Sequence, residues 1–197
     1  MFIHTYIGPT KGHNSLLASL LHLTLRRRSI RIVLRLWPIS QPALRVRFEH
    51  GGKMEDLEEA ITLERAALEL QPEAHSNRSV SMSALATSLQ TRFEHAGWSE
   101  DLEEAITLKR AALELRSEGN PDRSVSLGNL ATSLQTRFYH GGRMDDLEEA
   151  IALERAALEL RPEGHPKRSV SLGNLASGLR TRFDRSGRKP SLWNVPR

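Results

Sequence analysis

Residues 123–162 read RSVSLGNLATSLQTRFYHGGRMDDLEEAIALERAALELRP, and this segment carries two helical patterns in succession. The first pattern has apolar residues at i, i+3, i+4, i+7 and i+11, the spacing of one face of an α-helix. These residues are Leu127, Leu130, Ala131, Leu134 and Phe138. The second pattern spreads its apolar residues over a wider arc, which is typical of a helix packed against two neighbours. We therefore predict a first-type helix, a turn and a second-type helix.

The second-type helix is expected to begin with an acidic turn. Asp146 is followed three residues later by Glu149, an arrangement that predicts a capping box, and these acids oppose the positive end of the helix dipole. Pro162 ends this helix, and Gly164, like Gly119 one unit earlier, is expected in the left-handed conformation after it. Its apolar residues are Leu147, Ala150, Ile151, Leu153, Ala157, Leu158 and Leu160. Serines near the start of each first-type helix are interpreted as N-caps: Ser79, Ser81, Ser124, Ser126, Ser169 and Ser171.

The same two patterns recur along the chain with a period of 45 residues. The motifs RFEHGG, RFEHAG, RFYHGG and RFDRSG begin at Arg47, Arg92, Arg137 and Arg182. Residues 56–100 share 30 of 45 positions with residues 101–145, and residues 101–145 share 32 of 45 with residues 146–190. A period of this size marks a repeat array in which each unit buries its apolar face against its neighbours. We therefore predict an all-α solenoid of antiparallel helix pairs.

Composition restricts the class of protein. The 197 residues are 39% hydrophobic and 26% charged, which fits one compact domain or a short array. The chain has no cysteine, which excludes disulfides, cysteine-ligated metal centres and thiol nucleophiles. Residues 1–48 contain eight Lys and Arg and no acidic residue, which leaves 20 of the 28 basic residues against all 24 acidic ones in the remainder. Because the main body is not basic, nucleic-acid binding is not expected.

Three segments follow from these patterns. Residues 1–42 form a divergent basic segment, irregular or partly helical, because Pro38 and Pro42 interrupt the place of a further first-type helix, and an internal proline costs a helix about 3 kcal/mol. Residues 43–187 form the helical array, and residues 188–197 form a C-terminal tail. The first segment is either a degenerate repeat or a mitochondrial targeting segment, since it is rich in arginine and free of acids. We expect a cytoplasmic protein, with a mitochondrial location as the alternative.

The residue types that support chemistry recur in every unit, which favours structural roles for them. The histidines of the repeats lie in predicted turns and loops, without the i, i+4 spacing of a helical metal site. Paired glutamates occur at the start of each second-type helix, whereas catalysis needs one unique constellation. No glycine-rich phosphate loop is present, and the apolar run at 16–25 is shorter than the about 20 residues of a membrane span. We expect no enzyme activity, metal, cofactor or membrane span.

The helix pair resembles the tetratricopeptide repeat. The matching positions are Asn129-Leu130-Ala131, where that family has Asn-Leu-Gly, together with Ala150-Ile151, Ala157-Leu158, Pro162, and Leu134 at the place of the family's tyrosine. The unit is longer than the usual 34 residues, and in this it resembles the kinesin light chain branch. The combination of motifs looks most similar to arrays from basidiomycete fungi that are attached to caspase-like CHAT or NTP-hydrolysing signalling domains. The resemblance covers about residues 43–187 and matches no catalytic domain.

This resemblance implies a non-catalytic protein–protein interaction module. In the family, first-type helices line a concave groove that binds an extended or helical peptide, so corresponding side chains 45 residues apart form ladders. Asparagines offer a donor and an acceptor to a peptide backbone, hydroxyls add further polar contacts, and arginines favour an acidic segment. The candidate peptide-binding residues are Asn129, Asn174, Thr87, Thr132, Ser177, Arg92, Arg137 and Arg182. The alternative interpretation is that these are ordinary exposed helix residues.

Two further alternatives stay open. The predicted array has two whole pairs, residues 78–116 and 123–161, and about three units are usually needed for stability, so the chain is expected either to be a fragment or to self-associate through its uncapped ends. The alternative function is that of a detached regulatory or sensor arm of a larger fungal signalling protein that contains a CHAT or NTPase domain. The sequence does not identify a ligand or a partner.

Overall fold

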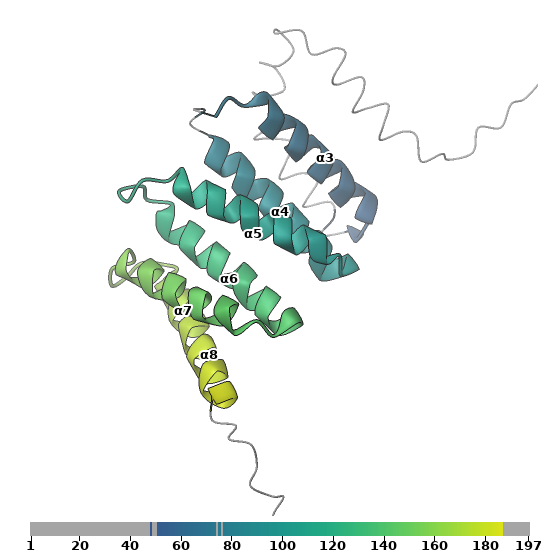
Figure 1. Cartoon of the computed structure of the whole chain (residues 1–197). Coiled ribbons are helices and arrows are strands. Elements are labelled where there is room, and N and C mark those ends of the chain that lie inside the picture. Colours follow the sequence, from purple (N-terminus) through teal and green to yellow (C-terminus); the bar gives the residue numbers. More distant parts are fainter. Residues whose placement is uncertain (1–47, 49–50, 74, 76, 187–197) are drawn as a thin grey trace, which may run out of the picture. The chain divides into compact units, whose positions relative to one another are not determined.

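The computed structural model describes residues 48, 51–73, 75 and 77–186 (Figure 1). Within these residues all regular secondary structure is helical, which confirms the all-α prediction. The helices are α3 (Met54–Leu70), α4 (Arg78–Ala96), α5 (Ser99–Glu114), α6 (Arg123–Gly141), α7 (Met144–Glu159) and α8 (Arg168–Ser186). The predicted segments 1–42 and 188–197 lie outside the described residues.

The helices alternate between the two predicted types. The second-type helices α3, α5 and α7 begin at residues 54, 99 and 144, and the first-type helices α4, α6 and α8 begin at residues 78, 123 and 168. Both series therefore advance by the 45-residue period of the sequence. The same local sequence gives the same local structure in each copy.

The described chain divides into two compact units within α4, between Ser88 and Leu89. The first unit holds α3 and the first half of α4, with Leu57, Ile61 and Leu85 buried. A hydrogen bond of 2.9 Å from the side-chain nitrogen of Gln71 to the hydroxyl of Ser81 links the end of α3 to the start of α4. The second unit holds the rest of α4 together with α5, α6, α7 and α8.

The core of the second unit lies between helices that follow one another in the chain. Helix α6 packs against α5, α7 and α8, and α7 also packs against α8 (Figure 1). The predicted apolar face of α6 is fully buried, as the periodicity indicated. Phe93 packs with Leu102 and Ile106 of α5, and the corresponding Phe138 packs with Leu147 and Ile151 of α7. One apolar contact pattern is thus built twice.

Glycine ends the first-type helices. The backbone N–H of Gly142 donates to the carbonyl of Phe138 at 2.7 Å, and Gly142 has a φ of 70°, so the helix closes with a left-handed residue. Gly52 and Gly97 do the same. Gly164 is left-handed as predicted, with a φ of 85°. The same prediction for Gly119 is wrong, since its φ is not positive and the loop before α6 closes instead through Asn120, whose side chain accepts a bond from the N–H of Asp122.

The predicted caps are also corrected. Helix α7 begins two residues before Asp146, at Met144, and has no side-chain cap hydrogen bond, so Asp146 is not the N-cap of a capping box. Two of the predicted cap serines accept bonds from the arginine that follows the preceding second-type helix: Ser126 accepts from Arg116, and Ser171 accepts from Arg161. Leu160, one of the apolar residues of the predicted second-type helix, is 43% exposed, and it lies at the end of α7.

In the part of the chain that the structure describes, no helix is long and apolar enough to cross a membrane.

Candidate functional site

The arginine near the end of a first-type helix is paired within the chain. Arg137 donates from Nε and Nη2 to the two carboxylate oxygens of Asp146 at 2.8 and 2.7 Å, and from Nη1 to Glu103 of α5. Arg92 makes the same two bonds to Asp101 at 2.6 and 2.7 Å. Hydrogen bonds to Asp146 and then to Glu103 raise the pKa of Arg137, although burial lowers it. These arginines therefore hold the turn between a first-type and a second-type helix.

Arg182 occupies the same position in α8, where it contacts Glu148 of α7 at 3.1 Å. All three arginines that the sequence placed in a peptide groove thus have carboxylate partners in their own chain. Their charge is compensated where they lie, so their surroundings give no support to selection of an acidic segment.

The candidate residues of α6 lie on one face of that helix. Asn129 and Thr132 are exposed, and the Thr132 hydroxyl donates to the carbonyl of Gly128 at 3.0 Å, which leaves its oxygen able to accept a bond. Half-buried Thr136 and exposed Tyr139 continue the same face at helical spacing. We call the residues Asn129, Thr132, Thr136 and Tyr139 the α6 stripe; its side chains are all uncharged.

A matching α8 stripe lies beside it and consists of Asn174, Ser177 and Thr181. The Tyr139 hydroxyl is 3.4 Å from Oγ1 of Thr181, and the side-chain nitrogen of Gln135 donates to the carbonyl of Asn174 at 3.4 Å. The structure therefore brings Asn129, Thr132, Asn174 and Ser177 onto one continuous surface of two neighbouring first-type helices. Thr87, the remaining candidate, belongs to the first unit, where its hydroxyl donates to the carbonyl of Ser83 at 2.8 Å.

The two asparagines of the predicted ladder are not equivalent. Asn129 is exposed, whereas half-buried Asn174 donates its side-chain N–H to Glu154 Oε1 at 2.9 Å. Glu154 is 1% exposed and also accepts from the Ser171 hydroxyl at 2.5 Å. Asn174 therefore satisfies a buried carboxylate, and only Asn129 presents its whole amide to solvent.

Tyr139 is the residue of this surface that the sequence reasoning missed. Its ring is 59% exposed, and the corresponding positions of α4 and α8 hold Glu94 and Asp184. The signal was present in the motif series, because RFYHGG has an aromatic residue where RFEHAG and RFDRSG have an acid. Comparing only the residues that the repeats share does not reveal Tyr139, because the repeats differ at its position.

A buried lysine lies next to Asn129, the first residue of the α6 stripe. Lys109 of α5 is 7% exposed, at a position where α3 and α7 have glutamate. Its ammonium group donates to Gln90 Oε1 at 2.5 Å, to the Ser133 hydroxyl at 2.5 Å and to the carbonyl of Asn129 at 3.4 Å. Burial lowers the pKa of Lys109 to about 8, and the charge of Glu94 opposes this shift only in part. The ammonium is thus held by uncharged acceptors.

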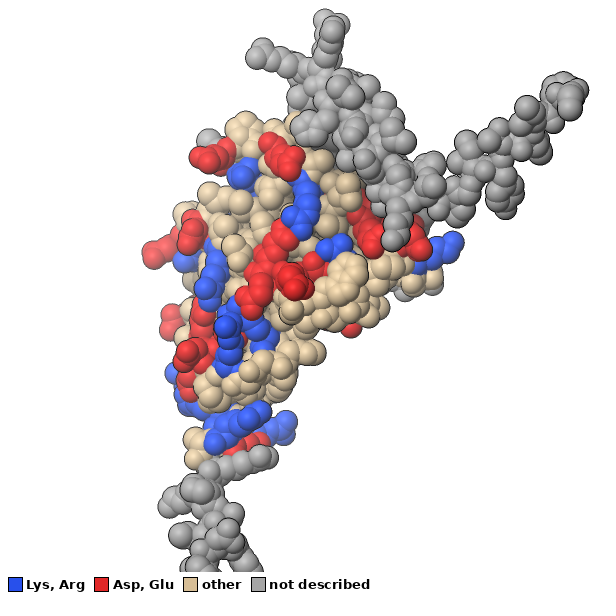
Figure 2. Space-filling view, turned by 45° about the vertical axis from the view of Figure 1, so that its right-hand side comes forward, with Lys and Arg blue, Asp and Glu red and all other residues tan. Residues whose placement is uncertain are grey.

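The second-type helices present a different surface. Arg110 of α5 contacts Glu149 of α7 at 2.6 Å, and Arg143 contacts Glu103 at 3.7 Å, so ion pairs run from one copy to the next. Figure 2 shows acidic and basic side chains next to one another on this part of the molecule. Within the described residues, no three His, Cys, Asp or Glu side chains are grouped so that they could hold a metal ion.

No protein-family model matches this chain, and no curated protein matches it in sequence.

Proposed function

We propose that this chain is a non-catalytic protein-interaction module, a tetratricopeptide-like solenoid whose α6 and α8 stripes bind a peptide. The repeat of both helix types every 45 residues and the Asn-Leu-Ala motif at residues 129–131 support this architecture. The proposed ligand is an extended or helical segment of another protein.

The observation that carries this proposal is the exposed ring of Tyr139, which belongs to the α6 stripe and contacts Thr181 of the α8 stripe. An exposed tyrosine gives a large, rigid contact area with a polar end, and such residues dominate the binding energy of many protein interfaces. The hydroxyls of Thr132, Thr136 and Thr181 and the amide of Asn129 add acceptors and donors along the same two stripes. This set suits a peptide backbone and one apolar side chain, because it contains no charge that selects an ionic group.

Peptide-display selection against the full chain tests the proposal. The counter-target is the Tyr139→Asp variant, which has the acid that α8 carries at the same position. The substitution also removes the edge contact of the Tyr139 ring with the ring of buried Phe138, whose centroids are 5.4 Å apart. Selected peptides are expected to lose affinity for this variant by a factor of about ten or more, as truncation of an interface anchor does. Asn129→Ala is expected to weaken the same peptides to a smaller extent.

Two controls make the result decisive. Thr107→Ala changes an exposed hydroxyl of the second-type helix α5 and is expected to leave peptide affinity unchanged. The melting temperatures of Asn129→Ala and Thr107→Ala are expected to stay at the wild-type value, because neither side chain is buried. That of Tyr139→Asp is expected to fall slightly, because the ring contact with Phe138 is lost. Peptides that bind the Tyr139→Asp and wild-type chains equally would remove the stripes from the function.

A further inference from the structure

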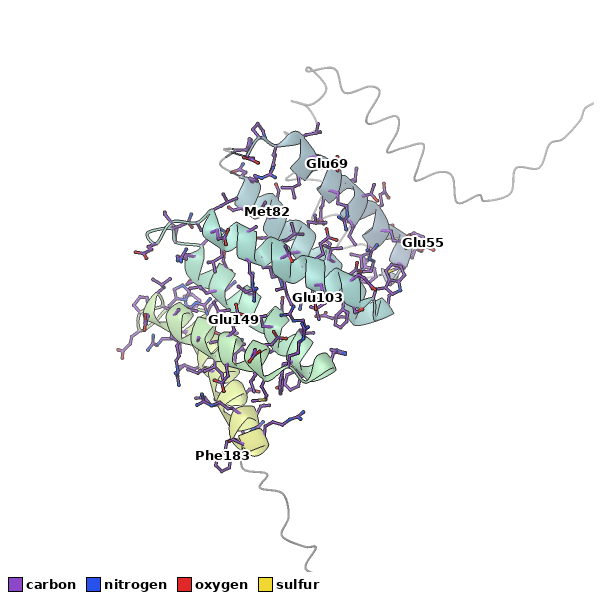
Figure 3. The ribbon with its side chains drawn as sticks, in the orientation of Figure 1. Glu55, Glu69, Met82, Glu103, Glu149 and Phe183 are labelled. Atoms are coloured by element: carbon purple, nitrogen blue, oxygen red, sulfur yellow. The ribbon has the colours of Figure 1, made fainter. Side chains whose placement is uncertain are left out.

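The side of α8 that faces away from α7 exposes apolar residues whose counterparts in α6 are buried. Phe183 is 72% exposed and Leu172 is 49% exposed, and the ring of Phe183 projects from the last turns of α8 (Figure 3). The corresponding residues of α6, Phe138 and Leu127, are 1% and 6% exposed. Ala176, exposed as well, lies between them in sequence on the same side of the helix. We call Leu172, Ala176 and Phe183 the end face.

The repeat itself shows what covers such a face. Phe93 of α4 packs with the Leu-Ile pair of α5, and Phe138 of α6 packs with Leu147 and Ile151 of α7. In both places the covering element is a second-type helix that begins Asp-Leu-Glu-Glu-Ala-Ile. Because α8 repeats the sequence of α6 at the end-face positions, it offers the same shape to a helix of the same kind.

The charge pattern agrees with the apolar pattern. Arg137 donates hydrogen bonds both to Asp146 of α7, the helix that covers α6, and to Glu103 of α5, the helix that precedes α6. Arg182 has Glu148, which corresponds to Glu103, but among the described residues it has no aspartate that corresponds to Asp146. The guanidinium group of Arg182, next to Phe183 in the sequence, thus has one of the two carboxylate contacts that Arg137 has.

Residues 187–197 do not repeat the Asp-Leu-Glu-Glu-Ala-Ile start, and Ser191 stands 45 positions after Asp146. In a second copy, each helix with the Asp-Leu-Glu-Glu-Ala-Ile start already buries its own leucine and isoleucine, as Leu57 and Ile61 of α3 show with 0% and 3% exposure. A helix of another protein on which the same face is exposed fits the end face.

We propose that the end face of α8 binds a helix of a partner protein that has a carboxylate in its first turn, leucine directly after it, and an Ala-Ile pair one turn further on. This is a second interaction surface, separate from the α8 stripe. The stripe residues are rotated to the opposite side of the helix, since Ser177 and Thr181 are five and nine positions from Leu172 at 100° per residue. The two surfaces can therefore be tested independently.

The probe is an acetylated and amidated peptide with the sequence of residues 143–161, which contains α7. Titration of the labelled peptide with the full chain, followed by fluorescence anisotropy, is expected to show saturable binding. Phe183→Asp in the chain, or Leu147→Asp in the peptide, is expected to weaken binding by a factor of about ten or more, because each places a charge in an apolar contact. Circular dichroism of the Phe183→Asp chain checks that the exposed position tolerates the change.

A charge exchange identifies the site. Asp146→Arg in the peptide is expected to abolish binding to the wild-type chain and to restore it to the Arg182→Asp chain, whereas Asp145→Arg, at the neighbouring exposed position, is expected to have little effect. Peptide binding that ignores Phe183→Asp and is not restored by the exchange would overturn the proposal. So would a chain dimer in sedimentation that Phe183→Asp dissociates, since a second copy would then be the occupant. The Tyr139→Asp chain is expected to bind this peptide normally, which separates the result from the peptide-binding function of the stripes.

Discussion

At the level of single residues, Lys109 occupies a position of the second-type helices where a charged side chain is buried. The same position holds Glu154 in the next copy, where Ser171 and Asn174 donate to the carboxylate. Around Lys109 the neighbours are acceptors instead, chiefly Gln90 and Ser133. The neighbours of each site therefore match the charge that is buried there. Removing a charged group from water still costs free energy, even when the group is hydrogen-bonded.

This cost predicts a pH dependence of stability. The pKa of Lys109 is about 8 in the folded chain and 10.5 in the unfolded chain, so above pH 8 the unfolded state holds more protons at this site. The free energy of unfolding is therefore expected to rise with pH between about 8 and 10.5, by at most about 3 kcal/mol relative to a Lys109→Met chain. Urea unfolding at pH 7, 8, 9 and 10 measures the difference.

The control for this experiment is Lys167→Met, because Lys167 is exposed. That variant is expected to follow the wild-type pH dependence. Equal pH profiles for the wild-type and Lys109→Met chains would show that Lys109 keeps an ordinary pKa.

The second prediction at this scale concerns two neighbouring aspartates. Asp146 is buried and accepts two bonds from Arg137, whereas Asp145 is exposed in the same helical turn. Asp146→Asn is expected to lower the free energy of unfolding by about 2 to 3 kcal/mol, because it removes one partner of a largely buried ion pair while Glu103 remains. Asp145→Asn loses only an interaction with the helix dipole and is expected to cost less than about 1 kcal/mol. Thermal unfolding of both variants gives the comparison, and equal losses would contradict the assigned role of Asp146.

The types of residue at the helix starts predicted where each helix begins better than they predicted what those residues bind. The sequence predicts that the acids at the start of α7 and the serines of the first-type helices are caps, since such residues at a helix start are typical caps. The structure uses Asp146 and Ser126 for tertiary bonds to Arg137 and Arg116. A side-chain oxygen near a helix start can serve either as a cap or as the partner of a residue on another helix. Only the packing of one helix on another distinguishes them, so local sequence could not.

At the level of elements, the helices themselves were predictable because their signal is periodic. The apolar face of α6 fixed its buried side, and the 45-residue period fixed the order of helix types. What periodicity cannot give is the distance between two helices. Gly178 shows this, because it replaces Ser133 of the preceding copy, and a side chain there would meet the Ile151 side chain at 3.0 Å. Helix α8 therefore lies close to α7 at this point.

The different surroundings of two glycines in α8 predict different effects of an alanine substitution on stability. Gly173 has open space where the methyl group of an alanine would lie, with no neighbouring atom within 4 Å, so Gly173→Ala is expected to stabilise the chain by about 0.5 to 1 kcal/mol through helix propensity. Gly178→Ala gains the same propensity but must displace Ile151. It is expected to be less stable than Gly173→Ala by about 1 kcal/mol or more. Chemical denaturation of both variants measures this difference, and equal stabilities would mean that the contact between α7 and α8 is looser than described.

At the level of the whole molecule, the candidate surfaces lie where the copies differ or where a neighbour is missing. Tyr139 differs from its counterparts, and the end face of α8 lacks the cover that α6 has. The residues that the repeats share predict the architecture but neither of these features, since shared residues mostly serve the fold. The arginines are the clearest case, because Arg92 and Arg137 each pair with the aspartate of the second-type helix that follows.

The last prediction follows from the nearest-neighbour character of such a chain. A copy of residues 142–186 inserted after Ser186 places an Asp-Leu-Glu-Glu-Ala-Ile helix on the end face. Burial of Leu172 and Phe183 then adds about 2 to 4 kcal/mol to the free energy of unfolding, so the melting temperature is expected to rise by about 5 °C or more. The matched control has the same insertion with the copied Leu147 and Ile151 replaced by Asp, which keeps the length but prevents packing against Phe183. A rise in the control as large as that in the intact insertion would show that added length, and not cover of the end face, stabilises the chain.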